Sequence, residues 1–235
     1  MYPRKDPLDL ITPLRLPNIE NYCTFAIQTI QRPFFMEAKT KQEVKHICVF
    51  CGSSSQTDPR FAEEARQLGR WMGERSKDLV YGAGNVGLMG ILADAVMQHG
   101  SQVKGVIPQF MVDAGWHHEG IQELIITRDM HERKRLMCDN SDAIIAFPGG
   151  IGTAEELLEA LTWKQLGLIT KPIIILNING HFNPLLQWLD QLIEGKFMRD
   201  IHRNMWVVVH QVSELDDAFQ QCLPWDSSVR KIAAI

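Results

Sequence analysis

The sequence has no run of about 20 apolar residues, the length needed to span a bilayer, so we expect no membrane-spanning segment. Prolines at positions 3, 7, 13, 17 and 33 interrupt the N-terminal stretch, which lacks the continuous apolar core of a secretory signal. The five cysteines are odd in number and show no framework spacing, as is usual in a reducing compartment. These absences predict a cytoplasmic protein.

An excess of positive charge is also missing. The formal net charge is −4, so the basic balance typical of nucleic-acid binding is absent and we expect no nucleic-acid partner. The pattern G-x-x-x-x-G-K-[ST] is absent, which argues against hydrolysis of nucleoside triphosphates. No internal repeat or low-complexity tract is visible. With 235 residues, the chain is long enough for one large domain with a sizeable core.

The chain divides at about residue 45. Residues 1–45 are rich in proline and end in a charged run, and we expect an arm that packs on the main domain or on a second subunit. Residues 46–235 alternate short apolar runs with helical periods, which predicts one domain. The expected strands are Ile47–Cys51, Leu79–Gly82, Val103–Ile107, Glu123–Thr127, Ala143–Phe147, Pro172–Leu176 and Met205–His210. The expected helices are Pro59–Arg75, Val86–His99, Met130–Asn140, Thr153–Leu166, Asn183–Glu194 and Val212–Cys222.

This alternation is typical of right-handed βαβ units. It predicts an α/β fold, a doubly wound and mostly parallel sheet of about seven strands in three α/β/α layers. In open sheets of this kind, ligands bind outside the carboxyl ends of the strands. The loops that follow the strands are therefore the places to look for a site.

A glycine-rich loop, with the sequence PGGIGT, joins one expected strand to the next helix. Its glycines let the backbone approach a bound group without obstruction by β-carbons. The first N–H groups of a helix have no intrahelical partner, and the helix dipole adds positive charge there, which suits a phosphate. Glu155 and Glu156 place two carboxylates beside that predicted anion. The residues of the predicted phosphate site are Gly149, Gly150, Ile151, Gly152 and Thr153.

Two further loops are expected at the same edge of the sheet. Gly82–Gly87 satisfies G-x-G-x-x-G, but no acidic residue stands at the tip of the next strand to hold a ribose, as dinucleotide binding would need. A tight turn with close packing, and contact with a mononucleotide through Gly84 and Asn85, both stay open. Ser53, in the turn Cys51–Ser55, would face the same cleft, although such a turn also commonly caps the next helix.

Glu156 has two interpretations. Thr153 and Glu156 have the spacing of a capping box, in which the glutamate reaches back to the start of its own helix. The alternative is a carboxylate that acts on a phosphorylated substrate. Arg133 and Lys134 stand near the start of the helix Met130–Asn140, where cations oppose the helix dipole and a nearby anion would remove the conflict.

These motifs also occur together in a known family. The segment Met130–Lys134, with the sequence MHERK, is followed by P-G-G-x-G-T-x-x-E at Pro148–Glu156, and further motifs stand at Cys51–Ser54, Tyr81–Gly90 and Thr162–Gly167. Over roughly residues 46–200 the chain resembles the Lonely Guy (LOG) family of cytokinin riboside 5′-monophosphate phosphoribohydrolases. Its members are often mislabelled as lysine decarboxylases, an activity that would require a pyridoxal-phosphate lysine.

The resemblance implies a Rossmann-like fold, a homodimer or higher homo-oligomer, and cleavage of a nucleoside 5′-monophosphate into a free base and ribose 5-phosphate. It implies that Arg133 and Glu156 are the catalytic pair, and that Met130, Lys134 and Glu155 join the glycine loop in binding the nucleotide. Arg133 does not deprotonate at working pH, so we assign it to positioning, and Glu156 to the developing oxocarbenium charge. We expect no cofactor.

One segment departs from the family pattern. Plant members carry an acidic residue that touches the substrate shortly after the Val-Ile-Pro strand end, where this chain offers Asp113 or Glu119. The preference between prenylated adenine nucleotides and AMP therefore stays open. A second hypothesis, from another class, is a nucleotide-binding carrier or sensor without turnover. A dinucleotide-dependent oxidoreductase is disfavoured by the missing ribose acid.

Two other groups resemble reactive sites. His117-His118-Glu119 lacks the spacing of a metal-binding pair on a helix, and we expect no metal. Cys48 and Cys51 have redox-motif spacing, but residues three apart in a strand face opposite sides of the sheet. We expect both cysteines to be core residues.

Overall fold

Seven strands form one sheet in the structure, a computed structural model that describes residues 43–229. The predicted arm, residues 1–45, lies outside the described residues except for its last three. The strands are β1 (His46–Phe50), β2 (Asp78–Tyr81), β3 (Val103–Pro108), β4 (Glu123–Thr127), β5 (Ala143–Ala146), β6 (Ile173–Leu176) and β7 (Val207–Val209). The α-helices are α2 (Pro59–Glu74), α3 (Gly87–Gln98), α4 (Gln109–Asp113), α5 (Met130–Asp139), α6 (Ile151–Gln165), α7 (Asn183–Glu194) and α8 (Leu215–Gln221).

The strand order is β4-β3-β2-β1-β5-β6-β7, and every pair is parallel. The chain builds one half of the sheet outward from β1 to β4, then returns beside β1 with β5 and builds the other half. This confirms the predicted doubly wound α/β fold, and it places the reversal of strand order between β1 and β5.

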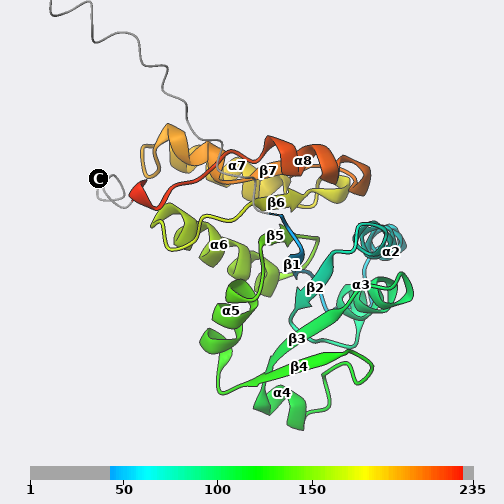
Figure 1. The fold of residues 1–235 in the computed structure, drawn as a ribbon. Helices are drawn as coiled ribbons and strands as arrows, with labels where there is room; N and C mark the ends of the chain where they lie inside the picture. The colour runs from blue at the N-terminus through cyan, green and yellow to red at the C-terminus, as the bar shows by residue number, and fades with distance from the viewer. Residues whose placement is uncertain (1–42, 230–235) are drawn as a thin grey trace, which may run out of the picture. The chain divides into compact units, whose positions relative to one another are not determined.

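Two hydrophobic clusters lie on the two faces of the sheet, which gives the three layers. Residues of α2, α3 and α8 pack with Ile47 and Val49 on one face. Residues of α5, α6 and α7 pack with Cys48 and Phe50 on the other, because successive strand residues point to opposite sides. Figure 1 shows α2 and α3 on one side of the strands, with α5 and α6 on the other.

The predicted elements are all present, with ends that move by up to three residues. The largest shift is in the last helix, because Val212–Glu214 forms a 3₁₀ turn before α8 begins. A 3₁₀ helix at Asp200–Met205 likewise delays β7. Helix α4 was not predicted, because its five residues are too few to show a helical period in the sequence. Gly100 has φ +87°, the left-handed conformation expected after α3.

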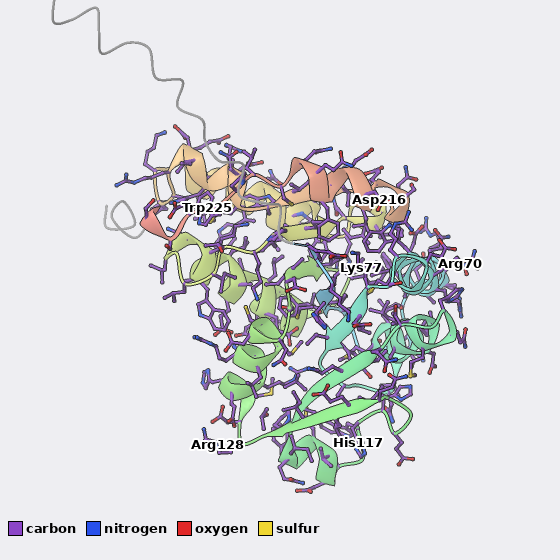
Figure 2. The ribbon with its side chains drawn as sticks, in the orientation of Figure 1. Arg70, Lys77, His117, Arg128, Asp216 and Trp225 are labelled. Carbon is purple, nitrogen blue, oxygen red and sulfur yellow. The ribbon has the colours of Figure 1, made fainter. Side chains whose placement is uncertain are left out.

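Long-range polar contacts fasten the outer helices. Arg75 at the end of α2 pairs with Asp216 of α8, with Nη2 2.6 Å from Oδ2. Trp225 donates its indole N–H to the carbonyl oxygen of Lys164 in α6, at 2.8 Å. Figure 2 labels Asp216 and Trp225, one residue from each of these two contacts. Within residues 43–229, no helix combines the length and apolarity needed to cross a membrane.

Helices α2 and α3 approach each other closely at Gly69. A β-carbon at this position would lie 2.4 Å from Cβ of Ala95 and 2.9 Å from the backbone nitrogen of Val96. The glycine is therefore required by helix packing and not by its conformation.

We expect Gly69→Ala to lower the free energy of unfolding by roughly 1–3 kcal/mol through overpacking, although alanine is the better helix former. Adding Ala95→Gly to that variant reopens the space and should restore part of the loss. Urea denaturation of the full chain measures both effects.

Arg70→Ala, an exposed change on the same helix, is the control and should alter stability by less than about 0.5 kcal/mol. A Gly69→Ala variant as stable as the parent would contradict the packing argument.

Candidate active site

The carboxyl ends of β1 and β5 lie side by side, and the chain leaves them toward opposite faces of the sheet. Two backbone hydrogen bonds join the loops at this point, from Phe147 N to Phe50 O at 2.8 Å and from Gly52 N to Pro148 O at 3.1 Å. In doubly wound sheets, ligands usually bind at this point, outside the carboxyl ends of the strands. The predicted glycine loop directly follows β5 there.

Helix α6 begins at Ile151, two residues earlier than predicted, with Gly150 as its N-cap. Thr153 is therefore a buried residue inside the first turn, and the capping-box interpretation of Thr153 and Glu156 is wrong. Glycine has no side chain with which to cap a helix, and α6 has no side-chain cap. The N–H groups of Ile151, Gly152 and Thr153 are the donors that such an end leaves without intrahelical partners.

The physical reason for glycine differs from one position of this loop to another. A β-carbon at Gly149 would lie 2.0 Å from Oγ1 of Thr153 and 2.8 Å from the nitrogen of Gly52, so packing requires glycine there. At Gly150 and Gly152 a β-carbon would meet no atom of the described residues within 4 Å, and neither has a left-handed φ. Neither conformation nor packing explains these two. Their open surroundings leave room for a ligand, and their contact with a phosphate stays a prediction.

Arg133 lies buried in α5 and points at the ends of three elements. Its Nε donates to the carbonyl oxygen of Val106 in β3 at 3.1 Å, and its Nη2 to that of Gly82 after β2 at 3.3 Å. Its Nη1 lies 3.0 Å from Oε1 of Glu156. The guanidinium is thus held at the carboxyl edge of the sheet, with its planar fork shared between backbone and carboxylate.

Glu156 lies in α6 opposite Arg133, and its side chain is 11% exposed. Burial raises the pKa of the Glu156 carboxyl above its usual range, and the nearby Arg133 charge opposes that rise. The arrangement places a carboxylate with a raised pKa beside the open glycines. A buried acid whose pKa is shifted beside a specific charge partner is a candidate functional group.

The neighbouring ion pair uses the other two predicted charges. Lys134 Nζ contacts Oε1 of Glu155 and lies 3.1 Å from Oε2 of Glu159, and its side chain is buried. In this structure Lys134 and Glu155 therefore hold α5 against α6. Their contact with a substrate stays a prediction.

The second glycine loop is explained by packing. A β-carbon at Gly82 would lie 1.8 Å from Nη2 of Arg133, so this glycine makes room for the guanidinium. Gly87 has φ +63°, and a β-carbon there would lie 2.4 Å from the backbone of Ser53. These contacts support the interpretation as a tight turn, and contact of Gly84 and Asn85 with a mononucleotide stays untested.

The remaining predicted residues lie in loops or at the ends of helices. Ser53 and Asn85 are exposed in the loops after β1 and β2, and Met130 is half-buried as the first residue of α5. Asp113 ends α4, and Glu119 is exposed in the loop that follows. Within residues 43–229, neither Asp113 nor Glu119 forms a hydrogen bond or ion pair with Glu156, so their role in substrate contact stays a prediction.

The histidine segment and the cysteine pair, the two other groups that resemble reactive sites, make ordinary structural contacts. His118 Nε2 lies 3.0 Å from Oδ1 of Asp94, and its Nδ1 accepts from the nitrogen of Gly120. Among the described residues, no group of three or more metal-binding side chains gathers. Cys48 and Cys51 belong to the clusters on opposite faces of the sheet, as predicted. Burial raises the pKa of both thiols, which suits core residues.

The sequence patterns did not point to His181. It follows Gly180 in the turn after β6, and its Nε2 lies 2.8 Å from the carbonyl oxygen of Gly149. Its place shortly after the carboxyl end of a strand was the available signal, but the contact spans 32 residues and depends on the strand order.

Comparison with known proteins gives concordant matches. Residues 89–219 match a family model described as possible lysine decarboxylase. The cytokinin riboside 5′-monophosphate phosphoribohydrolase LOG7 of Arabidopsis thaliana is 43% identical over 198 residues, which cover 80% of this chain and 91% of the relative. The probable cytokinin riboside 5′-monophosphate phosphoribohydrolase LOGL2 of Oryza sativa subsp. japonica is 41% identical over 185 residues, covering 79% and 76%.

Solved structures show the same fold. The Moco carrier protein of Chlamydomonas reinhardtii superposes with a TM-score of 0.59 at 20% identity, covering 77% of this chain and 98% of that one. The molybdenum cofactor binding protein of Rippkaea orientalis gives 0.58 at 20% identity, covering 76% and 97%. At this identity the likeness concerns the fold alone.

The open space at Gly152 allows a direct test of the predicted phosphate site at Gly149–Thr153, the glycine cradle. Gly152→Ala should raise the free energy of unfolding, by up to about 1 kcal/mol, because alanine is the better helix former. The same methyl group should weaken the binding of ribose 5-phosphate, because it narrows the approach to the helix amides. Denaturation and titration calorimetry measure the two effects separately.

Gly150→Ala is the companion change, and it should weaken binding in the same way. Unchanged affinity in both variants would show that the phosphate binds elsewhere.

Proposed function

Because the chain belongs to the LOG family of cytokinin riboside 5′-monophosphate phosphoribohydrolases, we propose that it hydrolyses the N-glycosidic bond of adenosine 5′-monophosphates. The substrates are N6-substituted nucleotides and AMP, and the products are the free base and ribose 5-phosphate. The observation that carries the proposal is the buried pair of Arg133 and Glu156, 3.0 Å apart, beside the open glycines of α6.

The 5′-phosphate binds at the start of α6 in this proposal. The backbone donors from Gly150 to Thr153 face the anion, and the helix dipole favours its charge. Ile151 is 91% exposed, so its N–H rather than its side chain serves the phosphate. A phosphate held here places the ribose over the neighbouring turn, where Glu156 lies.

Cleavage develops positive charge on the ribose as the bond between C1′ and the base nitrogen breaks. The bonding electrons leave with the base. Water supplies a hydroxyl to C1′ and a proton to the departing base, so one water molecule is consumed for each bond broken. The Glu156 carboxylate stabilises the developing charge and orients the ribose hydroxyls or the attacking water.

Arg133 positions the substrate and does not transfer protons, because its guanidinium stays protonated. Its two backbone contacts fix it against β2 and β3, and it presents the remaining N–H groups to the phosphate and ribose. A carrier would need the phosphate cradle but has little need for a buried carboxylate next to it, since an added negative charge there opposes binding. We therefore favour the enzyme over the carrier.

We also propose a homo-oligomer located in the cytoplasm. Leu157 and Leu161 of α6 are buried in the core, whereas Leu166 and Leu168 beyond the helix are 44% and 53% exposed and suit a subunit contact. Among the described residues, Cys48, Cys51 and Cys138 are buried free thiols, as expected in a reducing compartment.

The proposed reaction predicts release of free base and ribose 5-phosphate from AMP and from N6-isopentenyl-AMP. Adenosine lacks the group that the α6 amides bind, so its kcat/KM should fall by at least about 100-fold, the cost of two or more lost charge-assisted hydrogen bonds. Chromatography of the products measures both. Equal rates with adenosine and AMP would remove the role of the glycine cradle.

The catalytic pair predicts the effect of two substitutions. Glu156→Gln removes the charge at nearly constant shape and Arg133→Ala removes the positioning group, and each should lower kcat by at least about 100-fold. The wild-type enzyme should lose activity as the pH falls through the raised pKa of Glu156, at a higher pH than an ordinary glutamate would require. Initial rates across pH measure this limb.

Glu159→Gln is the matched control, because it removes the same charge one turn further along α6 and leaves Glu156 in place. Its kcat should stay within about threefold of the parent, as for a partly exposed ion pair. Parent-like turnover of Glu156→Gln would exclude the assigned role, and loss of its folded circular-dichroism spectrum would assign Glu156 to stability instead.

A further inference from the structure

His181 belongs to a turn built by the residues around it. After β6, the side chain of Asn177 accepts from the nitrogen of Phe182 at 2.7 Å and donates to Oδ1 of Asn183 at 2.8 Å. Asn179 and Gly180 both have left-handed φ values, +52° and +70°. Non-glycine residues rarely adopt this backbone conformation unless other contacts hold it, so Asn179 indicates that the turn has one defined shape.

The imidazole bridges this turn to two other segments. It makes edge contacts with Phe182, at 5.0 Å between ring centroids, and with Phe61 of α2, at 5.7 Å. Its Nε2 lies 2.8 Å from the oxygen and 3.3 Å from the nitrogen of Gly149. Nε2 either donates to the Gly149 oxygen or accepts from the Gly149 nitrogen, depending on whether it carries the proton. Because the contact with the oxygen is shorter, we assign Nε2 as the donor to the carbonyl.

The direction of that carbonyl determines the direction of the next N–H group. The peptide bond from Gly149 to Gly150 is trans, so its C=O and N–H point to opposite sides. When His181 holds the oxygen of Gly149, the N–H of Gly150 is turned away from His181, at the start of α6. Glycine pairs rotate easily, so without this bond the peptide has more orientations available.

We propose that His181 is a positioning residue, which fixes the Gly149–Gly150 peptide so that the Gly150 N–H faces the bound phosphate. This inference rests on the proposed function, because it takes the 5′-phosphate to bind at the start of α6. The residue acts through the backbone of Gly149 and contributes to binding of the phosphate rather than to bond cleavage.

The experiment compares three variants of the full chain by titration calorimetry with ribose 5-phosphate and by steady-state kinetics with AMP. His181→Phe keeps a ring against Phe61 and Phe182 but removes the donor. His181→Gln keeps a donor and removes the ring. His210→Phe changes an exposed histidine after β7 and is the control.

His181→Phe should weaken ribose 5-phosphate binding about three- to tenfold, the effect of one lost hydrogen bond, and should raise the KM for AMP by a similar factor. Its kcat should change less than its KM, because the catalytic pair is untouched. His181→Gln should recover most of the affinity, and His210→Phe should match the parent. Should His181→Phe fold poorly, His181→Leu gives the same comparison.

Parent-like binding by His181→Phe, or a His181→Gln variant no better than His181→Phe, would overturn the proposal. So would a parent protein that fails to bind ribose 5-phosphate. If the parent binds ribose 5-phosphate but releases no base from any nucleotide, the proposed reaction fails alone. A difference between the variants in binding would then still support His181.

Discussion

The structure of the site depends on the ion pair between Arg133 and Glu156. Burying two charges is unfavourable unless each has a partner, and here the guanidinium also donates to the carbonyl oxygens of Val106 and Gly82. One side chain thus connects α6, which follows β5, to the ends of β2 and β3 in the other half of the sheet. The reversal of strand order brings these elements together, and the ion pair fixes how they meet.

The structure separates glycines that packing requires from glycines that it does not require. Arg133 packs against Gly82, and Thr153 packs against Gly149. A β-carbon at either glycine would therefore displace one of these side chains. Gly150 and Gly152 have free space and ordinary backbone angles. A glycine-rich motif alone does not distinguish the two kinds. The structure does, because it shows what a β-carbon would meet at each position.

The sequence was sufficient for the sheet because each buried strand is a short apolar run between helical periods. The edge that carries the site followed from parallel topology. The start of α6 could not be predicted, since Thr153 has good capping chemistry but the N-cap is Gly150, which has no side chain. The ion pair of Lys134 with Glu159 and the contact of His181 with Gly149 were also missed. Both join residues far apart in the chain, and their geometry depends on packing.

The proposed site would place a negatively charged phosphate close to the Glu156 carboxylate, and this closeness needs an explanation. Burial already raises the pKa of Glu156, and an arriving phosphate would add charge that acts in the same direction. Arg133 offsets both effects, because it lies against Glu156 and its fork also suits phosphate oxygens. A site that only held a nucleotide would be more stable with a neutral residue at position 156. In the proposed reaction, the carboxylate instead stabilises positive charge that develops on the ribose when the bond to the base breaks.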